Sequence, residues 1–297
     1  MSDARWVPLA VAVVLAAAGP VFSQDADVCL SCHGAEGLVL TLPGGETLPA
    51  TVDRAVVDRS VHGGLGCASC HPAQTSYPHP PVTARTRRDF TARAAQVCAT
   101  CHPDPAGQFD SSVHGRAQVL GLADAPTCVS CHGAHEVVRA RTPEFRNNTP
   151  QLCGSCHARP EIMAKYGLRA VYETYISEFH GVTTTLYRIT TPVSPSPAAT
   201  CYDCHGVHDI RAADDPASRV HPSNILATCR TCHPQAGQYF ATAWTEHRAP
   251  GPDAAPLVYY VQLFYRVLIP SVVGFLTVLT VLDLGRWAGD QLRRNRR

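Results

Sequence analysis

The chain has 297 residues, a formal net charge of +1 and 45% hydrophobic residues, with 24 prolines, 21 glycines and 14 cysteines. The charge is balanced and no basic block lies in the middle of the chain, which argues against nucleic acid as a partner. Much of the apolar content lies at the two ends, in Trp6–Ala18 and Leu257–Leu282. The segment between them cannot bury enough apolar side chain to offset its ordering entropy, so something else must supply part of the core.

The first 23 residues have the pattern of a secretory signal peptide. Arg5 precedes the apolar run, and Val21-Phe22-Ser23 before Gln24 offers a small-residue cleavage site. The alternative is an uncleaved N-terminal anchor, which is disfavoured because the apolar run is shorter than the roughly 20 residues that span a bilayer. The sequence therefore predicts export of the segment that follows.

All 14 cysteines fall into seven C-x-x-C pairs, and a histidine follows each pair at once. We number these motifs 1 to 7 in chain order: Cys29-Cys32-His33, Cys67-Cys70-His71, Cys98-Cys101-His102, Cys128-Cys131-His132, Cys153-Cys156-His157, Cys201-Cys204-His205 and Cys229-Cys232-His233. C-x-x-C-H is the covalent attachment motif of c-type haem, in which the histidine is an axial ligand of the iron. Zinc ribbons need two such pairs per metal and no fixed histidine, and structural disulfides explain an even cysteine count but not this spacing. A thioredoxin-like redox pair has the same C-x-x-C spacing, but a histidine after all seven pairs favours haem attachment. The motifs predict seven covalent haem c groups.

Eight histidines lie outside the motifs: His62, His79, His114, His135, His180, His208, His221 and His247. Only Met1 and Met163 could provide a methionine ligand, so we expect two histidines on each iron, and haem potentials at the lower end of the range. We predict that seven of the eight are second axial ligands and that His221 is the surplus residue.

The surroundings of these histidines support a ligand role. Ser60-Val61-His62-Gly63 and Ser112-Val113-His114-Gly115 are the same tetrapeptide, and Phe179-His180-Gly181 ends a comparable segment. His135 and His208 come three residues after a motif histidine, too close to reach the far side of the same iron, so each is expected to serve another haem. His79 lies in a rigid proline-flanked loop. The sequence leaves open which histidine serves which iron.

Between the ends we predict short helices joined by the motif turns, at Thr86–Ala99, Ala106–Val113, Ala158–Tyr166, Leu168–Phe179, Asn224–Cys232 and Gln235–Glu246. Leu38–Val52, with Pro43-Gly44-Gly45 at its middle, predicts one small β-hairpin. Thr190–Thr200 carries three prolines and is predicted to be a loop or a boundary near 190–200. The expected fold is mainly α with much irregular structure and a haem-stacked core, formed by residues 24–256.

The second apolar segment predicts a single transmembrane helix over residues 257–284. Tyr259, Tyr260, Phe264 and Tyr265 form an aromatic belt near its start, where Arg266 can snorkel. Ser271, Gly274 and Thr277 either form a stripe for close helix contact or reflect the usual small residues of membrane helices. Arg286, Arg293, Arg294, Arg296 and Arg297 follow, so residues 285–297 are expected to be a cytoplasmic basic tail. The haem domain would then face the periplasm, anchored to the cytoplasmic membrane.

The C-x-x-C-H motifs, the Ser-Val-His-Gly and Cys-His-Gly-x-His elements and the stretch Gly37–Thr47 together resemble the multihaem cytochrome c family of bacterial respiratory chains. The resemblance implies a periplasmic cytochrome that works beside a membrane b-type cytochrome or another quinone-reactive subunit. It implies electron transfer between that subunit and periplasmic carriers or terminal reductases. The alternative is a multihaem reductase of a small nitrogen or sulfur oxyanion at one haem, which would need an iron without a protein sixth ligand.

Overall fold

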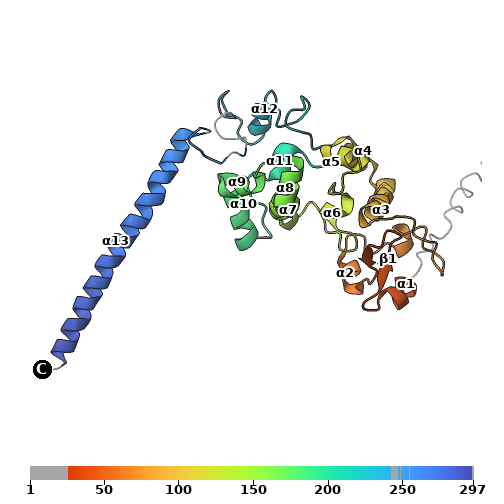
Figure 1. Ribbon diagram of the computed structural model, residues 1–297, viewed down its shortest axis with the longest axis horizontal. Helices are drawn as coiled ribbons and strands as arrows, with labels where there is room; N and C mark the ends of the chain where they lie inside the picture. The colour runs from red at the N-terminus through yellow and green to blue at the C-terminus, as the bar shows by residue number, and fades with distance from the viewer. Residues whose placement is uncertain (1–25, 242–246, 248, 254, 296–297) are drawn as a thin grey trace, which may run out of the picture.

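The computed structural model describes residues 26–241, 247, 249–253 and 255–295, so the predicted signal peptide, Arg296 and Arg297 lie outside the described residues. Within the described part the chain is mainly helical, with one two-stranded hairpin and much irregular structure (Figure 1). This confirms the predicted fold class.

The β-hairpin forms where the sequence predicts it. Strand β1 (Val39–Thr41) pairs antiparallel with β2 (Thr47–Pro49), and Leu40 lies opposite Leu48. Gly45 in the turn has a φ of 90°, a conformation that glycine adopts without steric cost. The alternation of side chains along both strands turns Leu40 and Leu48 to the same, less exposed face.

Helix α3 (Arg87–Cys101) begins as predicted, because the Thr86 hydroxyl accepts a hydrogen bond from the Asp89 amide at 3.1 Å. The helix predicted at Ala106–Val113 is instead two helices, α4 (Pro103–Ser111) and α5 (Val113–Val119). The break has a local cause, since the Ser112 hydroxyl accepts from the Gly115 amide at 3.1 Å and thus caps α5.

Three further predicted helices are confirmed in shortened form: α8 (Pro160–Tyr166), α9 (Val171–Ser177) and α12 (Ile225–Arg230). The helix predicted from Gln235 is wrong in its described part, because residues 235–241 form turns, and residues 242–246 lie outside the described residues. Seven elements were not predicted: α1 (Ala26–His33), α2 (Arg54–Arg59), the 3-10 turn η1 (Cys67–Ser69), α6 (Cys128–His132), α7 (Pro143–His157), α10 (Phe179–Thr190) and α11 (Cys201–His205).

Apolar side chains form only a small core in this fold. The buried apolar residues among those described are Leu42, Ala84, Ala95, Ile162, Tyr175, Ala198, Ala236 and Ala241, and most of these are alanines. Buried polar residues such as Asn147, Thr184 and Thr200 are as frequent. So little buried apolar area cannot by itself offset the ordering entropy of this many residues.

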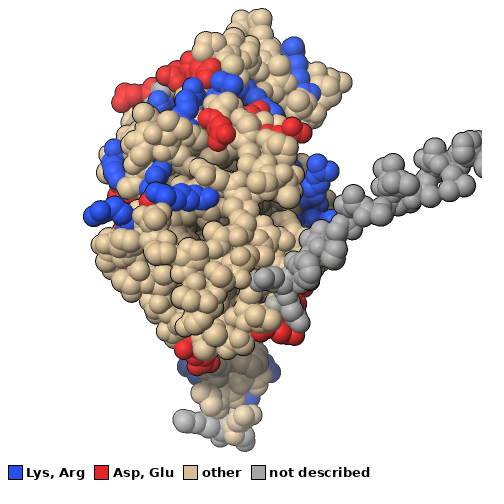
Figure 2. Space-filling model, turned by 90° about the vertical axis from the view of Figure 1, so that its right-hand side faces the viewer, with Lys and Arg blue, Asp and Glu red and all other residues tan. Residues whose placement is uncertain are grey.

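The helices follow one another along an elongated body. Figure 1 shows α1 at one end and α9, α10 and the start of α13 at the other, with α3, α6 and α7 between them in chain order. Seen from the α1 end, cationic and anionic side chains are interspersed over the upper part of the surface, above a broad uncharged area (Figure 2). Neither sign forms an extended patch on this face.

The last helix, α13 (Pro256–Arg294), has 39 residues and a mean hydropathy of 2.2 over its most apolar window. Among the described residues it is the one helix long and apolar enough to span a membrane. Ser271, Thr277 and Thr280 each donate their hydroxyl proton to the carbonyl four residues earlier, at 2.8–2.9 Å. These groups are therefore satisfied within the helix, as a lipid environment requires.

Candidate functional site

Each C-x-x-C-H motif lies in a helix or helical turn or begins in one. Motifs 1, 3, 4, 5 and 6 end α1, α3, α6, α7 and α11, motif 2 begins in η1, and motif 7 begins in α12. Residues three apart on a helix share a face, so the two thiols of each motif project to the same side. Thr127 and Thr200 each form a capping box that starts the motif helix one residue before the first cysteine.

The structure brings every motif histidine against a second histidine from elsewhere in the chain. The ring centres of the seven pairs are 6.0–6.3 Å apart: His33 with His79, His71 with His135, His102 with His62, His132 with His208, His157 with His114, His205 with His247 and His233 with His180. The eighth histidine, His221, bonds to the Ser223 hydroxyl at 2.7 Å, and no histidine ring lies beside it in the described part of the chain.

The pairs fit an iron held between two imidazoles. Metal–imidazole nitrogen bonds are about 2 Å long, so two rings on opposite sides of one ion have centres about 6 Å apart. Rings in van der Waals contact would lie closer, and rings joined by a hydrogen-bonded water would have no reason to repeat one distance seven times. Two thiols three residues apart beside each pair are the groups that would form the thioether bonds of a covalently attached haem.

Burial favours the neutral form of several of these imidazoles. It lowers the pKa of His71, His114 and His157, and burial together with the neighbouring His247 lowers the pKa of His205 to about 4. Neutral imidazole has the free nitrogen lone pair that a metal ion needs. The electrostatic setting of the rings is thus that of ligands rather than of charged surface groups.

The pairing repeats every two motifs. His62, His114 and His180 each lie between an odd motif and the next even one, and each pairs with the following odd motif, that is, motifs 3, 5 and 7. His135 and His208 follow motifs 4 and 6, and they reach back to motifs 2 and 4. We call each odd motif together with the next even motif a two-motif unit; neighbouring units exchange histidines in both directions.

Two equivalent backbone hydrogen bonds hold the units together. The Val61 amide donates to the Val137 carbonyl, and the Val113 amide donates to the Ile210 carbonyl, each at 2.9 Å. In both cases the donor precedes a paired histidine, and the acceptor lies two residues after the histidine of a Cys-His-Gly-x-His element. The same contact therefore joins unit 1 to unit 2 and unit 2 to unit 3.

A glycine follows each of His62, His114 and His180 for a steric reason. At Gly63, Gly115 and Gly181 a Cβ atom would collide with the carbonyl oxygen of the residue six positions earlier. The chain before each histidine folds back tightly onto the residue after it. Only glycine permits this approach, which explains the His-Gly pair seen in the sequence.

Thiols of consecutive motifs lie beside one another in an alternating pattern. Within each unit the first cysteines of the two motifs are within hydrogen-bonding reach: Cys29 with Cys67, Cys98 with Cys128 and Cys153 with Cys201. Between units, the second cysteine of the even motif lies near both cysteines of the next motif. Burial, followed by the nearby thiols of the next motif, raises the pKa of Cys70. The same two causes raise the pKa of Cys131 to about 11. Cys204, next to Cys229 and Cys232, follows the same pattern. The seven motifs thus form one continuous series in chain order.

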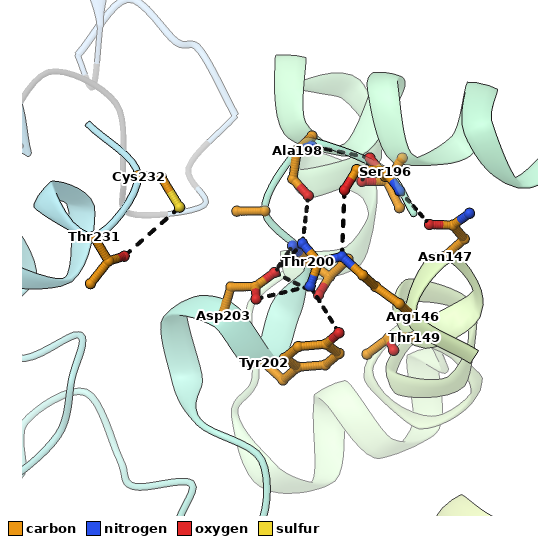
Figure 3. Close-up of polar contacts among 12 residues, drawn as sticks. Arg146, Asn147, Thr149, Ser196, Ala198, Thr200, Tyr202, Asp203, Thr231 and Cys232 are labelled. Carbon is orange, nitrogen blue, oxygen red and sulfur yellow. Dashed lines mark hydrogen bonds and ion pairs between the residues drawn. The ribbon is translucent and has the colours of Figure 1, made fainter. Parts of the chain in front are cut away.

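A polar network fixes motif 6 to the helix that carries motif 5. Arg146 on α7 donates to the Tyr202 hydroxyl at 2.8 Å, to the Asp203 carboxylate at 3.0 Å and to the Ala198 carbonyl at 3.1 Å (Figure 3). Asp203 also accepts from the Thr200 amide at 2.6 Å, which starts α11. The network ties the predicted loop at Thr190–Thr200 to α7 as well, because the Asn147 side chain bonds to the Ser194 carbonyl and the Ser196 amide.

Sequence reasoning did not find Arg146 or Asn147. Both lie in a helix that was not predicted, and their partners are some 50 residues away along the chain. The sequence did contain one indication of Arg146. Asp203 lies between the two cysteines of motif 6, and a carboxylate in such a partly buried position needs a cationic partner.

Residues 121–251 match a family model described as outer membrane cytochrome MtrC/MtrF-like, domains II/IV. The match supports a multihaem c-type cytochrome, a family that transfers electrons and holds haem c covalently. Searches of the curated proteins and of the solved structures gave no significant match.

Proposed function

We propose that this chain is a membrane-anchored cytochrome with seven haem c groups, which conducts electrons between a quinone-linked membrane partner and periplasmic carriers or terminal reductases. The observation that carries the proposal is the set of seven histidine pairs, each beside its own pair of thiols, arranged in one series. Bound haem supplies reversible one-electron transfer at each iron.

The chain's own residues place the seven sites and keep them in order. Each motif histidine and its partner would hold one haem iron between them, so His62, His79, His114, His135, His180, His208 and His247 would be the second ligands. Thiols of consecutive motifs lie close enough to influence one another's pKa, which supports attachment points that follow one another closely from motif 1 to motif 7. A chain of closely spaced sites is what conduction over the length of the domain requires.

The pairing favours conduction over catalysis at one haem. A reductase of a small oxyanion needs an iron with an open or displaceable sixth position. Each of the seven motif histidines has a second imidazole opposite it.

The series has two distinct ends. Eight residues separate His247, the second ligand at motif 6, from α13, so motifs 6 and 7 lie nearest the membrane and motif 1 is the distant end. Helix α13 contains no histidine and is a single span, so quinone chemistry belongs to a separate subunit, such as an integral membrane b-type cytochrome. The motif 1 end then exchanges electrons with periplasmic proteins.

The test uses the full chain purified from a host that attaches haem c. Intact mass should show seven haems, and electron paramagnetic resonance should show low-spin iron with two histidine ligands. Membranes that also contain the partner should reduce the chain with quinol, whereas the purified chain should not react with quinol at a comparable rate. A mass with six or fewer haems, or a large high-spin fraction, would refute the proposal.

A further inference from the structure

Helix α10 has an exposed apolar stripe that the haem sites do not use. Phe179, Val182, Leu186 and Ile189, spaced three or four residues apart, are 78, 53, 56 and 66% exposed. On a helix this spacing forms one continuous face. Four large apolar side chains in one row on the surface of a folded domain indicate an interaction site.

The opposite side of α10 holds it in the domain. Gly181 and Thr184 are buried, and the helix packs there against α7 and α9. Thr184 accepts from the buried Tyr175 hydroxyl at 3.3 Å. His180, whose ring faces His233, is two residues before Val182 and therefore points to nearly the opposite side of the helix. Val182, Leu186 and Ile189 consequently face away from the site at motif 7, and a haem bound there would not cover them. Phe179 borders that site, because its ring centre is 6.0 Å from that of His180.

We infer that the stripe lies in the interfacial region of the lipid bilayer that α13 crosses. The first argument is distance. Eight residues separate His247 from Pro256, and an extended chain covers at most about 3.5 Å per residue, so the site at motif 6 lies within about 30 Å of the start of α13. Motif 7 is next in the series, and α10 supplies its second histidine. Figure 1 shows α9 and α10 at the end of the domain nearest α13.

The second argument is charge. Helix α10 contains no carboxylate, and its one charged residue, Arg188, has its Nε buried rather than on the stripe. A protein partner is commonly recognised through charges at the rim of an apolar patch, whereas uncharged apolar side chains backed by threonines suit the boundary between headgroups and acyl chains. The aromatic residues Tyr259, Tyr260 and Phe264 at the start of α13 occupy the same boundary. With α13 and α10 both held there, the domain has one fixed orientation, and the end of the haem series faces the membrane.

The inference rests on α13 lying in the bilayer, which resistance to carbonate extraction tests separately in the same membranes. The photo-crosslinking residue p-benzoylphenylalanine replaces Leu186 in the full chain, with a second variant at Ile189 in case one site impairs folding. Tyr77, 90% exposed and far from α13 in sequence, is the matched control. The haem absorption spectrum shows whether each variant is folded.

After irradiation of native membranes, the variants labelled in place of Leu186 or Ile189 should each gain the mass of one phospholipid. The variant labelled in place of Tyr77 should gain none. An adduct with another protein at both stripe positions would overturn the inference in favour of a protein partner. No adduct at either position, in chains that are folded and resist carbonate, would overturn it as well. Loss of chain on carbonate treatment would instead refute the membrane anchor of the proposed function.

Discussion

At the scale of single residues, Arg146 provides hydrogen bonds that hold the helical turn of motif 6 in place. Its side chain is 23% exposed and ties Asp203 and Tyr202 of motif 6 to the helix of motif 5. Hydrogen bonds to charged groups contribute more to stability than neutral ones, and removing one partner leaves the other unsatisfied. Two neighbouring sites of the series therefore depend on one guanidinium.

We expect Arg146→Ala to destabilise the domain by roughly 1–3 kcal/mol, because the Asp203 carboxylate and the carbonyls of Ser196 and Ala198 each lose a donor. Thermal unfolding followed by the haem spectrum measures the change. Arg93→Ala is the control: it removes an arginine that also pairs with an aspartate, Asp89, but is 56% exposed. An exposed pair contributes little, so the midpoint of this variant should not move measurably. Equal loss in both variants would contradict the role given to Arg146.

The second ligand at motif 2 provides the sharpest test of the pairing, because His135 adjoins motif 4 in sequence but lies against His71. His135→Ala should produce one high-spin haem. Adding Cys67→Ser and Cys70→Ser, which removes the attachment point at motif 2, should abolish that high-spin signal, whereas Cys128→Ser and Cys131→Ser should leave it. The reverse result would assign His135 to motif 4.

The sequence was sufficient to select these histidines as candidate ligands, because their neighbouring residues recur and because eight histidines are available for seven motifs. It could not pair them. His208 and His132 are 76 residues apart, and no local pattern specifies which of several sites such a segment reaches. The pairing depends on how units pack, which is a property of the whole fold.

At the scale of elements, helices were predictable where a cap and a spaced apolar pattern coincide, as at Thr86 and α3. Helices α7 and α10 were missed for different reasons. Pro150 and two asparagines interrupt the pattern of α7, which is stabilised by its contacts with the Thr190–Thr200 loop. The apolar residues of α10 do have a helical spacing, but Val182 and the three threonines that follow it are β-branched and have low helix propensity.

Gly115 and Gly107 provide a matched comparison at this scale. Gly115→Ala should destabilise the chain by roughly 1–3 kcal/mol, because the new methyl group collides with the Phe109 carbonyl and displaces His114. Gly107 lies inside α4 with nothing near its missing side chain, so Gly107→Ala should raise stability by about 0.5–1 kcal/mol. Chemical denaturation gives both values. We also expect a partly high-spin haem in the first variant only.

At the scale of the whole molecule, the arginines after the apolar stretch of α13 predict that this end of the chain faces the cytoplasm. In inverted vesicles, protease added outside should remove the tail that follows Asp283 and leave residues 24–256 intact. Immunoblotting with a tag at each end of the mature chain shows which end is cut. Cleavage within the haem-bearing region from that side would reverse the proposed orientation.

In the proposed topology the chain reaches the periplasm amino end first, so motifs 3, 5 and 7 would find their second histidine already exported, whereas motifs 2, 4 and 6 would not. At motif 3 the partner has already emerged, because His62 precedes His102 by 40 residues. At motif 4 it has not, because His208 follows His132 by 76 residues. The even-numbered motifs would therefore lack their second histidine until later parts of the chain have crossed the membrane. Assembly would be complete only when the carboxyl-terminal part arrives, so a prematurely terminated chain would be an incompletely ligated cytochrome and not a shorter working one.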